Sequence, residues 1–324
     1  MENVLALDVG GTTTRVGIFE RRPEKPLRVA LQTYGTREFP TIEAMAMAFL
    51  RGAGISSSSL SAACIGAAGP VLDGVATLTN APVRVDARAV AHTLGVSRVS
   101  LLNDLEALAY AVPVLSSDEL CILQQGRANE SGAIGIIAAG TGLGEAVLYR
   151  IGQQLIVKPS EAGRADFAAR TERDITVLRS LTREHGRAAT EQVVSGSGLV
   201  NIHRALQKSD CAARIDMTTA EAPAAVADSA IYGRCPTCVE AMEAFVEAYG
   251  AEAGNLALRT VATGGVYIGG GIAPKILDAL KSGAFLSAFS MKSPFTTLLQ
   301  SIPVKVILNS EAGLLGAAHY CSIA

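Results

Sequence analysis

The sequence contains two copies of one short pattern, in which an apolar strand is followed by a turn of glycine and threonine and then by a second strand. The first copy reads LALDVGGTTTRVGIF over residues 5–19, and the second reads IIAAGTGLGEAVL over residues 136–148. A strand, a glycine turn and another strand in so few residues indicate a β-hairpin. Two such hairpins predict an internally duplicated fold with one hairpin in each lobe.

The rest of the chain alternates between strands and helices. A buried strand over 99–102 leads into a helix that starts near Asp104, and a strand over 304–308 precedes a helix over 311–320. This alternation is typical of an α/β fold, and 324 residues are long for a single core. We expect a small α/β lobe over residues 1–110, completed by the C-terminal helix 311–324, and a large α/β lobe over residues 111–310.

Composition and charge disfavour several classes of protein. The formal net charge of -2 and the absence of a basic patch do not suit a nucleic-acid binder. The uncharged runs are short and broken by glycine, so we expect no membrane span. The N-terminus has no basic region followed by an apolar segment, and six scattered cysteines suit a reducing compartment, so we expect a cytoplasmic protein.

Two of the cysteines, Cys235 and Cys238, form a CxxC motif. A zinc site would need a second pair of ligands, and none stands nearby at a usual zinc-site spacing. We therefore expect two free thiols near the start of a helix, with a redox or metal role as the less favoured alternative.

Three glycine turns follow apolar strands, at Gly10-Gly11-Thr12, Gly140-Thr141-Gly142 and Gly269-Gly270-Gly271. Glycine lets backbone N–H groups approach an oxygen-rich ligand, and Thr12 adds a hydroxyl donor. Asp8, just before the first turn, could hold Mg²⁺ through water, because Mg²⁺ gives up its waters reluctantly. Each turn taken alone is also explained as an ordinary hairpin turn or as close packing of a strand on a helix.

The other common nucleotide motifs are absent. The sequence has neither GxxxxGK[ST] nor a strand-linked GxGxxG, which disfavours a P-loop enzyme and a Rossmann dinucleotide site.

Asn103-Asp104 lies where a buried strand meets a helix. An aspartate at this position is a natural N-cap. The alternative is a general base that accepts a hydroxyl proton late in the attack on phosphorus, because a free aspartate has a pKa of roughly 3.9.

Seven segments, taken in order along the chain, resemble segments of the bacterial glucokinases. They are LALDVGGTTTRVGIF (5–19), LLNDLEALAYAVP (101–113), IIAAGTGLGEAVL (136–148), PSEAGRADF (159–167), TEQVVSGSGLVNIHRAL (190–206), GGVYIGGGIAPKIL (264–277) and EAGLLGAAHY (311–320). The resemblance implies a two-lobed hexokinase/actin-like (ribonuclease H-like) α/β fold with a nucleotide cleft between the lobes. It also implies an ATP:hexose 6-phosphotransferase that uses ATP and Mg²⁺ to convert glucose to glucose 6-phosphate, and a homodimer.

The resemblance also assigns roles to individual positions. Asp104 matches the catalytic base for the sugar 6-hydroxyl. The positions that match sugar-binding residues are Asn80, Asn103, Asp104, Glu161, Glu191 and, in place of a family histidine, Arg164. The positions that match ATP-binding residues are Asp8, Gly10, Gly11, Thr12, Gly140, Thr141, Gly142, Gly269, Gly270 and Gly271, with Asp8 also matching the Mg²⁺ position.

Three departures from the family pattern concern the sugar. Arg164 is always charged and cannot accept a hydrogen bond. The asparagine that usually follows the first turn is Thr13, and a tryptophan usual near Asn80 is missing. Two alternatives therefore stay open beside glucokinase: a kinase for a different hexose or sugar derivative, and a non-catalytic sugar sensor. A two-lobed ATPase of the actin or chaperone type would leave Asn103, Glu161 and Glu191 without a purpose.

Overall fold

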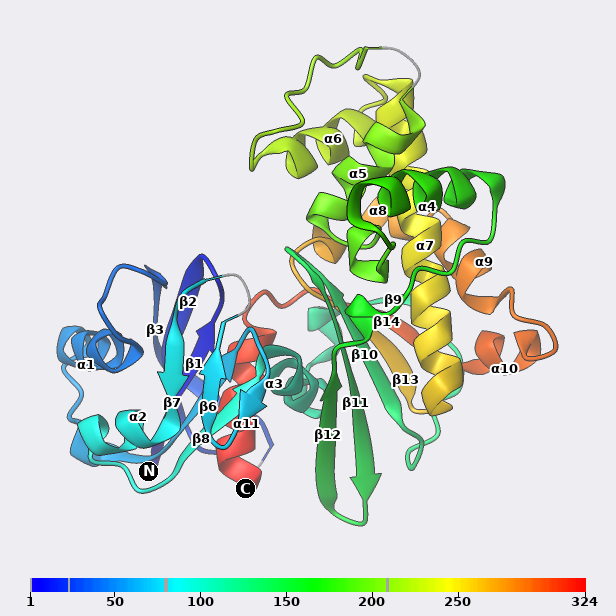
Figure 1. Ribbon diagram of the computed structural model, residues 1–324. Coiled ribbons are helices and arrows are strands. Elements are labelled where there is room, and N and C mark those ends of the chain that lie inside the picture. The colour runs from blue at the N-terminus through cyan, green and yellow to red at the C-terminus, as the bar shows by residue number, and fades with distance from the viewer. Residues whose placement is uncertain (1, 23, 79–80, 208–209) are drawn as a thin grey trace. The chain divides into compact units, whose positions relative to one another are not determined.

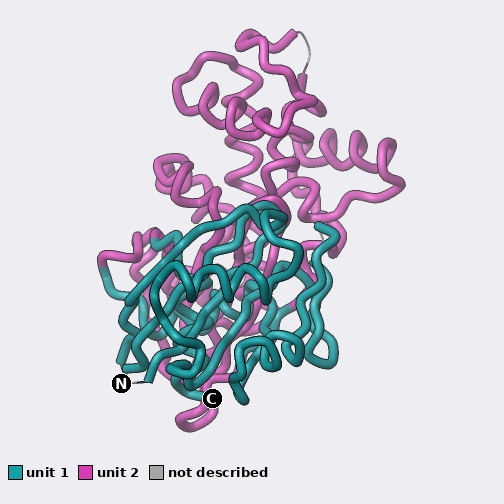
Figure 2. The backbone as a smooth tube through the Cα atoms, turned by 90° about the vertical axis from the view of Figure 1, so that its left-hand side faces the viewer, with its two compact units in different colours: residues 1–117, 157–159, 309–324 teal, residues 118–156, 160–308 magenta. Residues whose placement is uncertain are grey.

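The computed structural model describes residues 2–22, 24–78, 81–207 and 210–324. The chain divides into two compact units (Figure 2). Unit 1 comprises Met1–Ser117, Val157–Pro159 and Asn309–Ala324, and unit 2 comprises Asp118–Ile156 and Ser160–Leu308. Each unit has its own sheet, helices and hydrophobic core.

The sheet of unit 1 has five strands in the order β3, β2, β1, β4, β8 (Figure 1). Their bounds are β3 Leu27–Gly35, β2 Thr13–Glu20, β1 Asn3–Val9, β4 Leu60–Ala67 and β8 Val99–Asn103. β1 pairs with β2 antiparallel and with β4 parallel, and β4 pairs with β8 parallel. β1 and β4 are buried along almost their whole length, as expected of strands with other elements covering both faces.

Four helices and a small second sheet complete unit 1. The helices are α1 Ile42–Ala53, α2 Ala87–Leu94, α3 Asp104–Ala111 and α11 Ala312–Ile323. The small sheet is formed by β5 Val71–Leu72, β6 Val75–Thr77 and β7 Arg84–Asp86. α11 packs against α3, β1 and β4. Gly316 makes this packing possible, because a Cβ there would overlap the Ala107 carbonyl oxygen of α3. The last helix of the chain therefore packs on the sheet that the first strands of the chain form.

The sheet of unit 2 has six strands in the order β12, β11, β10, β13, β14, β9. Their bounds are β12 Gln154–Ser160, β11 Leu143–Ile151, β10 Ile134–Ala139, β13 Gly265–Gly269, β14 Val304–Ile307 and β9 Leu120–Gln124. β10 pairs with β11 antiparallel and with β13 parallel, and β13 pairs with β14 parallel. These are the strand directions of β2, β1, β4 and β8, so the predicted duplication with one hairpin per unit is confirmed.

The helices of unit 2 pack around one long, buried helix, α7 (Figure 1). Their bounds are α4 Glu172–His185, α5 Gly196–Leu206, α6 Ala222–Ile231, α7 Pro236–Thr260, α8 Leu277–Lys281, α9 Ala284–Ser290 and α10 Thr296–Ser301. α7 contacts α5, α6, α9 and the strand β10. Its Phe245 and Tyr249 stack edge to face with each other, and Tyr249 does the same with Phe285 of α9, which forms the aromatic centre of the core.

Short 3₁₀ helices occur at η1 Ser57–Ser59, η2 Val112–Val114, η3 Ser117–Glu119, η4 Ala162–Arg164, η5 Thr190–Gln192 and η6 Ala273–Ile276. Among the residues that the structure describes, no helix combines the length and apolarity needed to cross a membrane.

Candidate functional site

In unit 1 the predicted site residues gather where three parallel strands end. The register pairs Asp8 of β1 with Gly66 of β4, and Ala67 of β4 with Asn103 of β8. α3 then begins at Asp104. The first glycine turn and Asn103-Asp104 therefore lie at one edge of the sheet, the edge at which open α/β sheets bind their ligands.

The first glycine turn is held in place through its carbonyl oxygens. The Gly10 N–H donates to the Thr13 carbonyl at 3.0 Å. Buried Thr36 follows β3, and its hydroxyl donates to the Gly10 carbonyl at 2.7 Å. The Thr36 N–H donates to the Thr12 carbonyl at 2.9 Å. These bonds fix the backbone of the turn at the end of β1 before any ligand is bound.

Asp8 lies in an electropositive environment. Arg15, its register partner on β2, contacts Oδ2 through Nη1 at 3.3 Å. Gly313, in the first turn of α11, is close enough that a Cβ there would lie 3.5 Å from the carboxylate, which places Asp8 beside the positive end of that helix. Burial raises the pKa of Asp8, and the charge of Arg15 opposes that rise.

Asn103, and not Asp104, caps α3. Its Oδ1 accepts the Leu105 N–H at 2.9 Å, and the Glu106 carboxylate accepts the Asn103 N–H at 3.4 Å, which forms a capping box. The N-cap alternative for Asp104 is therefore wrong by one residue. Asn103 Nδ2 also donates to the Gly69 carbonyl at 3.1 Å, which leaves the amide one donor and one acceptor position for a ligand.

Asp104 occupies the first position of α3. It is half-buried, and its Oδ1 accepts the Leu105 N–H at 3.0 Å. Asp104 therefore shares the Leu105 N–H with the Asn103 cap. A carboxylate at this position is stabilised by the helix dipole and can face a ligand at the strand edge.

In unit 2 the second glycine turn is tied to the start of α5. The Gly140 N–H donates to the Gly142 carbonyl at 2.8 Å, and the Gly196 N–H donates to the Gly140 carbonyl at 2.9 Å. The turn therefore connects the end of β10 with the first residue of α5.

The third glycine turn lies beside the second. β10 and β13 are parallel, with Ala138 opposite Gly269. Gly270 has a φ of +83°, and a Cβ there would overlap the Ala139 carbonyl oxygen, so both backbone conformation and space require glycine. The buried Tyr249 hydroxyl accepts the Ala139 N–H at 3.1 Å and donates toward the Gly269 carbonyl at 3.5 Å. The two turns form one continuous edge.

Glu191 is oriented by a cation and by the second turn. Its Oε2 accepts the Leu143 N–H at 3.2 Å and lies so close to Gly142 that a Cβ there would overlap it. Its Oε1 contacts Arg164 Nη2 at 3.0 Å. Glu161, whose carbonyl accepts the Arg164 N–H at 2.9 Å, is exposed just before η4. Arg164 thus pairs with a neighbouring predicted sugar-binding residue.

A short backbone pairing brings η4 and η5 together. Asp166 and Ala189 form an isolated antiparallel bridge, and the Thr190 N–H donates to the Ala165 carbonyl at 2.9 Å. This pairing joins segments about 25 residues apart in sequence and explains why Arg164 meets Glu191.

The predicted site residues fall into two groups. Unit 1 holds Asp8, Gly10, Gly11, Thr12, Asn103 and Asp104, and unit 2 holds Gly140, Thr141, Gly142, Glu161, Arg164, Glu191, Gly269, Gly270 and Gly271. Asn80 lies outside the described residues. A hollow of about 640 Å³ in unit 1, between α1 and α2, includes none of the predicted site residues that the structure describes.

One group of potential ligands was missed. Cys235 and Cys238 are free thiols at the start of α7, as expected, but the expectation that no second pair of ligands lies nearby is wrong. His203 of α5 and Cys211 complete a cluster whose four ligand atoms lie within 4.8 Å of one another. The only signal in the sequence was a histidine and a third cysteine upstream of the CxxC, at a spacing that no common motif describes.

A buried acidic pair lies beneath the second turn. Glu145 of β11 is buried, its Oε1 has no hydrogen-bond partner among the described residues, and it lies close to Glu252 of α7. Glu252 accepts from Asn255 Nδ2 and Arg259 Nη1, each at 2.8 Å. Burial and the charge of Glu252 raise the pKa of Glu145 to about 8, while Arg259 partly opposes the rise.

The fold is the α/β fold of the hexokinase- and actin-like proteins. The glucokinase family profile matches residues 5–323. The glucokinase of Nostoc sp. is 39% identical over 337 aligned positions and 98% of each chain, and that of Photorhabdus laumondii is 33% identical over 98% of this chain and 96% of the relative. The crystal structure of glucokinase from an Antarctic psychrotroph superposes with a TM-score of 0.86 at 28% identity, covering 99% of this chain and 98% of that one. This chain belongs to the glucokinase family.

The raised pKa of Glu145 predicts a specific dependence of stability on pH. Its pKa is about 8 in the folded protein against an ordinary value of 4.5. The contribution of the protonated group to stability is therefore complete below pH 4.5 and is lost as the pH rises to about 8. Glu145→Gln keeps the group neutral, so we expect its melting temperature to fall less than that of the wild type across this interval.

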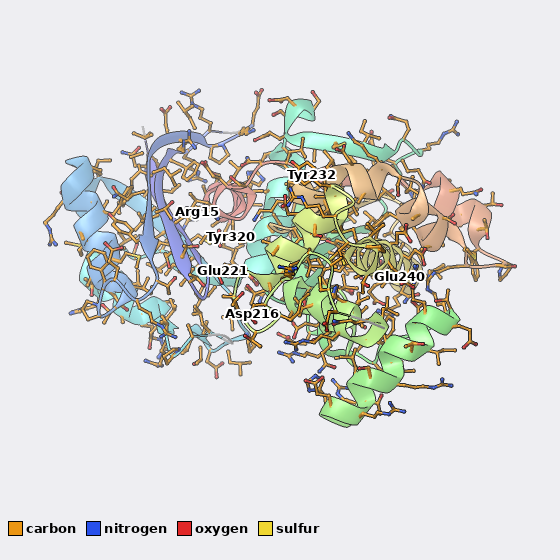
Figure 3. The ribbon with its side chains drawn as sticks, turned by 90° about the horizontal axis from the view of Figure 1, so that it is seen from above. Arg15, Asp216, Glu221, Tyr232, Glu240 and Tyr320 are labelled. Carbon is orange, nitrogen blue, oxygen red and sulfur yellow. The ribbon has the colours of Figure 1, made fainter. Side chains whose placement is uncertain are left out.

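The matched control is Glu240→Gln, on the exposed surface of α7 (labelled in Figure 3), which should follow the wild-type profile. If the melting temperatures of all three proteins change in parallel with pH over this interval, the raised pKa of Glu145 is contradicted.

Proposed function

We propose that this protein is an ATP-dependent glucokinase, which transfers the γ-phosphoryl group of ATP to the 6-hydroxyl of glucose and releases glucose 6-phosphate and ADP. The observation that carries this proposal is the match to the glucokinase family over residues 5–323, with relatives of that name at 32–39% identity over nearly their whole length. The glycine turns and the Asn103-Asp104 pair at strand ends support it.

Asp104 is the base in this proposal. As the sugar oxygen forms its bond to the γ-phosphorus and the bond from that phosphorus to the bridging oxygen of ADP breaks, the hydroxyl proton passes to the Asp104 carboxylate. A carboxylate is a weak base, so this transfer comes late, and most of the acceleration comes from positioning and from stabilisation of charge on the phosphoryl group. The place of Asp104 at the start of α3, at the end of β8, supports the assignment.

The three glycine turns would bind ATP. In the first two turns, backbone N–H groups would face the phosphates, and the third turn would lie against the adenosine. Asp8 fits a magnesium ion, because it presents carboxylate oxygens beside the first turn and contacts Arg15 only at 3.3 Å, a long ion pair. Bound there with its waters, Mg²⁺ would neutralise phosphate charge.

The sugar would be held by Asn80, Asn103, Asp104, Glu161 and Glu191. Carboxylates and amides can each pair with two neighbouring hydroxyls, and a site of this kind rejects analogues that lack one. The contact of Arg164 supports glucose, rather than an acidic sugar, as the substrate, because its guanidinium already pairs with the Glu191 carboxylate. We therefore propose that Arg164 positions Glu191.

We further propose that the protein acts in the cytoplasm as a homodimer, with a small lobe of residues 1–110 and 311–324 and a large lobe of residues 111–310. Likeness to the family supports these points. The net charge of -2 supports the expectation of no nucleic-acid partner.

Replacing Asp104 tests the proposed base. Because general-base catalysis contributes roughly 10²- to 10⁴-fold, we expect Asp104→Ala to lower kcat by at least about 100-fold. Glucose should still raise the melting temperature of the variant, since other residues also hold the sugar. The measurement is coupled ADP production with glucose and ATP–Mg²⁺, beside a thermal shift assay.

Asp278→Asn, an exposed change on α8, is the control and should retain full turnover. Near-normal turnover of Asp104→Ala would exclude Asp104 as the base.

Replacing Arg164 tests its positioning role. The pair with Glu191 is more than half exposed on the arginine side, and exposed pairs contribute about 0.2–1 kcal/mol. We expect Arg164→Ala to raise the KM for glucose about 2- to 5-fold with little change in kcat. If Arg164 acts through Glu191, the same change made in a Glu191→Gln background should have almost no further effect.

If the effects of the two substitutions are instead fully additive, Arg164 does not act through Glu191. A loss confined to acidic sugars such as glucuronate would instead assign Arg164 to direct substrate recognition.

A further inference from the structure

Unit 2 contains a compact cluster of three cysteines and one histidine, supplied by three separate segments. His203 lies in the last turn of α5, Cys211 in the loop between α5 and α6, and Cys235 and Cys238 at the start of α7. Their ligand atoms all lie within 4.8 Å of one another. His203, Cys235 and Cys238 are buried, and Cys211 is half-buried.

The sulfur separations match metal coordination rather than a disulfide. Cys211 Sγ lies 3.6 Å from Cys235 Sγ and 3.9 Å from Cys238 Sγ. A disulfide bond is only about 2.05 Å long. Zinc–sulfur bonds of about 2.3 Å in a tetrahedron place sulfur atoms about 3.8 Å apart. Cys211 is therefore spaced from Cys235 and from Cys238 as it would be around one tetrahedral ion.

His203 independently indicates a missing ligand. Its side chain is fully buried, yet neither Nδ1 nor Nε2 has a hydrogen-bond partner among the described residues. A buried polar group without a partner is costly, and native structures contain few. A metal ion in the cluster would satisfy one of these nitrogens.

The start of α7 provides an environment that favours a thiolate at Cys235. Cys235 is the N-cap residue of α7, with Pro236 at the first helical position. The backbone N–H groups of Cys238 and Ala212 donate to Cys235 Sγ. Such hydrogen bonds and the positive end of a helix stabilise negative charge on metal-bound sulfur.

We propose that His203, Cys211, Cys235 and Cys238 bind one zinc ion in a closed, tetrahedral site. Three thiolates and one imidazole make a soft ligand set that selects zinc over magnesium, and four protein ligands leave no open position for catalysis. The role is structural and goes beyond the proposed kinase activity. On binding, each coordinating thiol releases its proton to solvent.

The ion would fasten the loop over 207–221, which has no helix or strand among its described residues (Asp216 and Glu221 are labelled in Figure 3). It would join this loop to the end of α5 and the start of α7. The first residue of α5, Gly196, also supports the second glycine turn. The site would therefore stabilise the helix on which that turn rests.

The experiment is metal analysis of the untagged full-length protein, purified without chelator. We expect about one zinc per chain, and after removal of the zinc we expect Co²⁺ to give the intense ligand-field absorption of a tetrahedral thiolate site. Cys211→Ser and Cys238→Ser should each weaken zinc binding by at least 100-fold in competition with a chromophoric chelator. Cys121→Ser, a half-buried cysteine outside the cluster, is the matched control and should bind like the wild type.

A second measurement does not depend on how well the variants fold. Removing zinc from the wild type should lower its melting temperature and speed tryptic cleavage after Arg214, in the loop. The proposal is overturned if the wild type neither contains nor takes up zinc, if Co²⁺ binds without thiolate absorption, or if denatured protein in the presence of chelator shows four reactive thiols rather than all six, which would indicate a disulfide. None of these readouts uses kinase activity, so failure of the zinc site and failure of the proposed function are distinguishable.

Discussion

The candidate site depends on one alignment in each unit: the first strand of the hairpin runs parallel to the strands that come later in the chain. In unit 1, β1, β4 and β8 run in one direction, so Asp8 and Asp104 reach the same sheet edge although almost a hundred residues separate them. In unit 2, β10 and β13 are parallel, so the second and third glycine turns also lie at one edge of the sheet. Gly270 shows how tight this constraint is, because any side chain there would enter the Ala139 carbonyl. The duplicated pattern thus gives each unit a sheet edge at which candidate site residues gather.

Local patterns in the sequence sufficed to predict the hairpins, the start of α3 and the α/β class. They could not decide which residue of Asn103-Asp104 caps the helix, because both types are good caps. Glu106, three residues after Asn103, was the signal that favours a capping box at Asn103. Contacts that depend on tertiary structure could not be predicted from the sequence. Arg164 meets Glu191 only because η4 and η5 are joined by a bridge, and the cysteine cluster forms only where α5 and α7 converge.

α5 and α7 link the candidate site residues of unit 2 to its hydrophobic core. The first residue of α5 holds the second glycine turn, and its last turn carries His203. α7 contributes Tyr249 beneath the turns, Glu252 beside the buried Glu145, and two of the cysteines at its start. A change in either helix would therefore reach the glycine turns through the backbone. A zinc ion at the proposed site would therefore be linked to the second glycine turn through α5.

Coupled ADP production by the wild-type protein would show whether the chain phosphorylates glucose. ATP–Mg²⁺ would be combined in turn with glucose, mannose, fructose, glucosamine, N-acetylglucosamine and glucuronate. We expect turnover with glucose and a kcat/KM at least about tenfold above that for the other sugars, because the polar groups of the proposed site match the hydroxyls of glucose. Preference for another sugar, or sugar binding without turnover, would contradict this expectation.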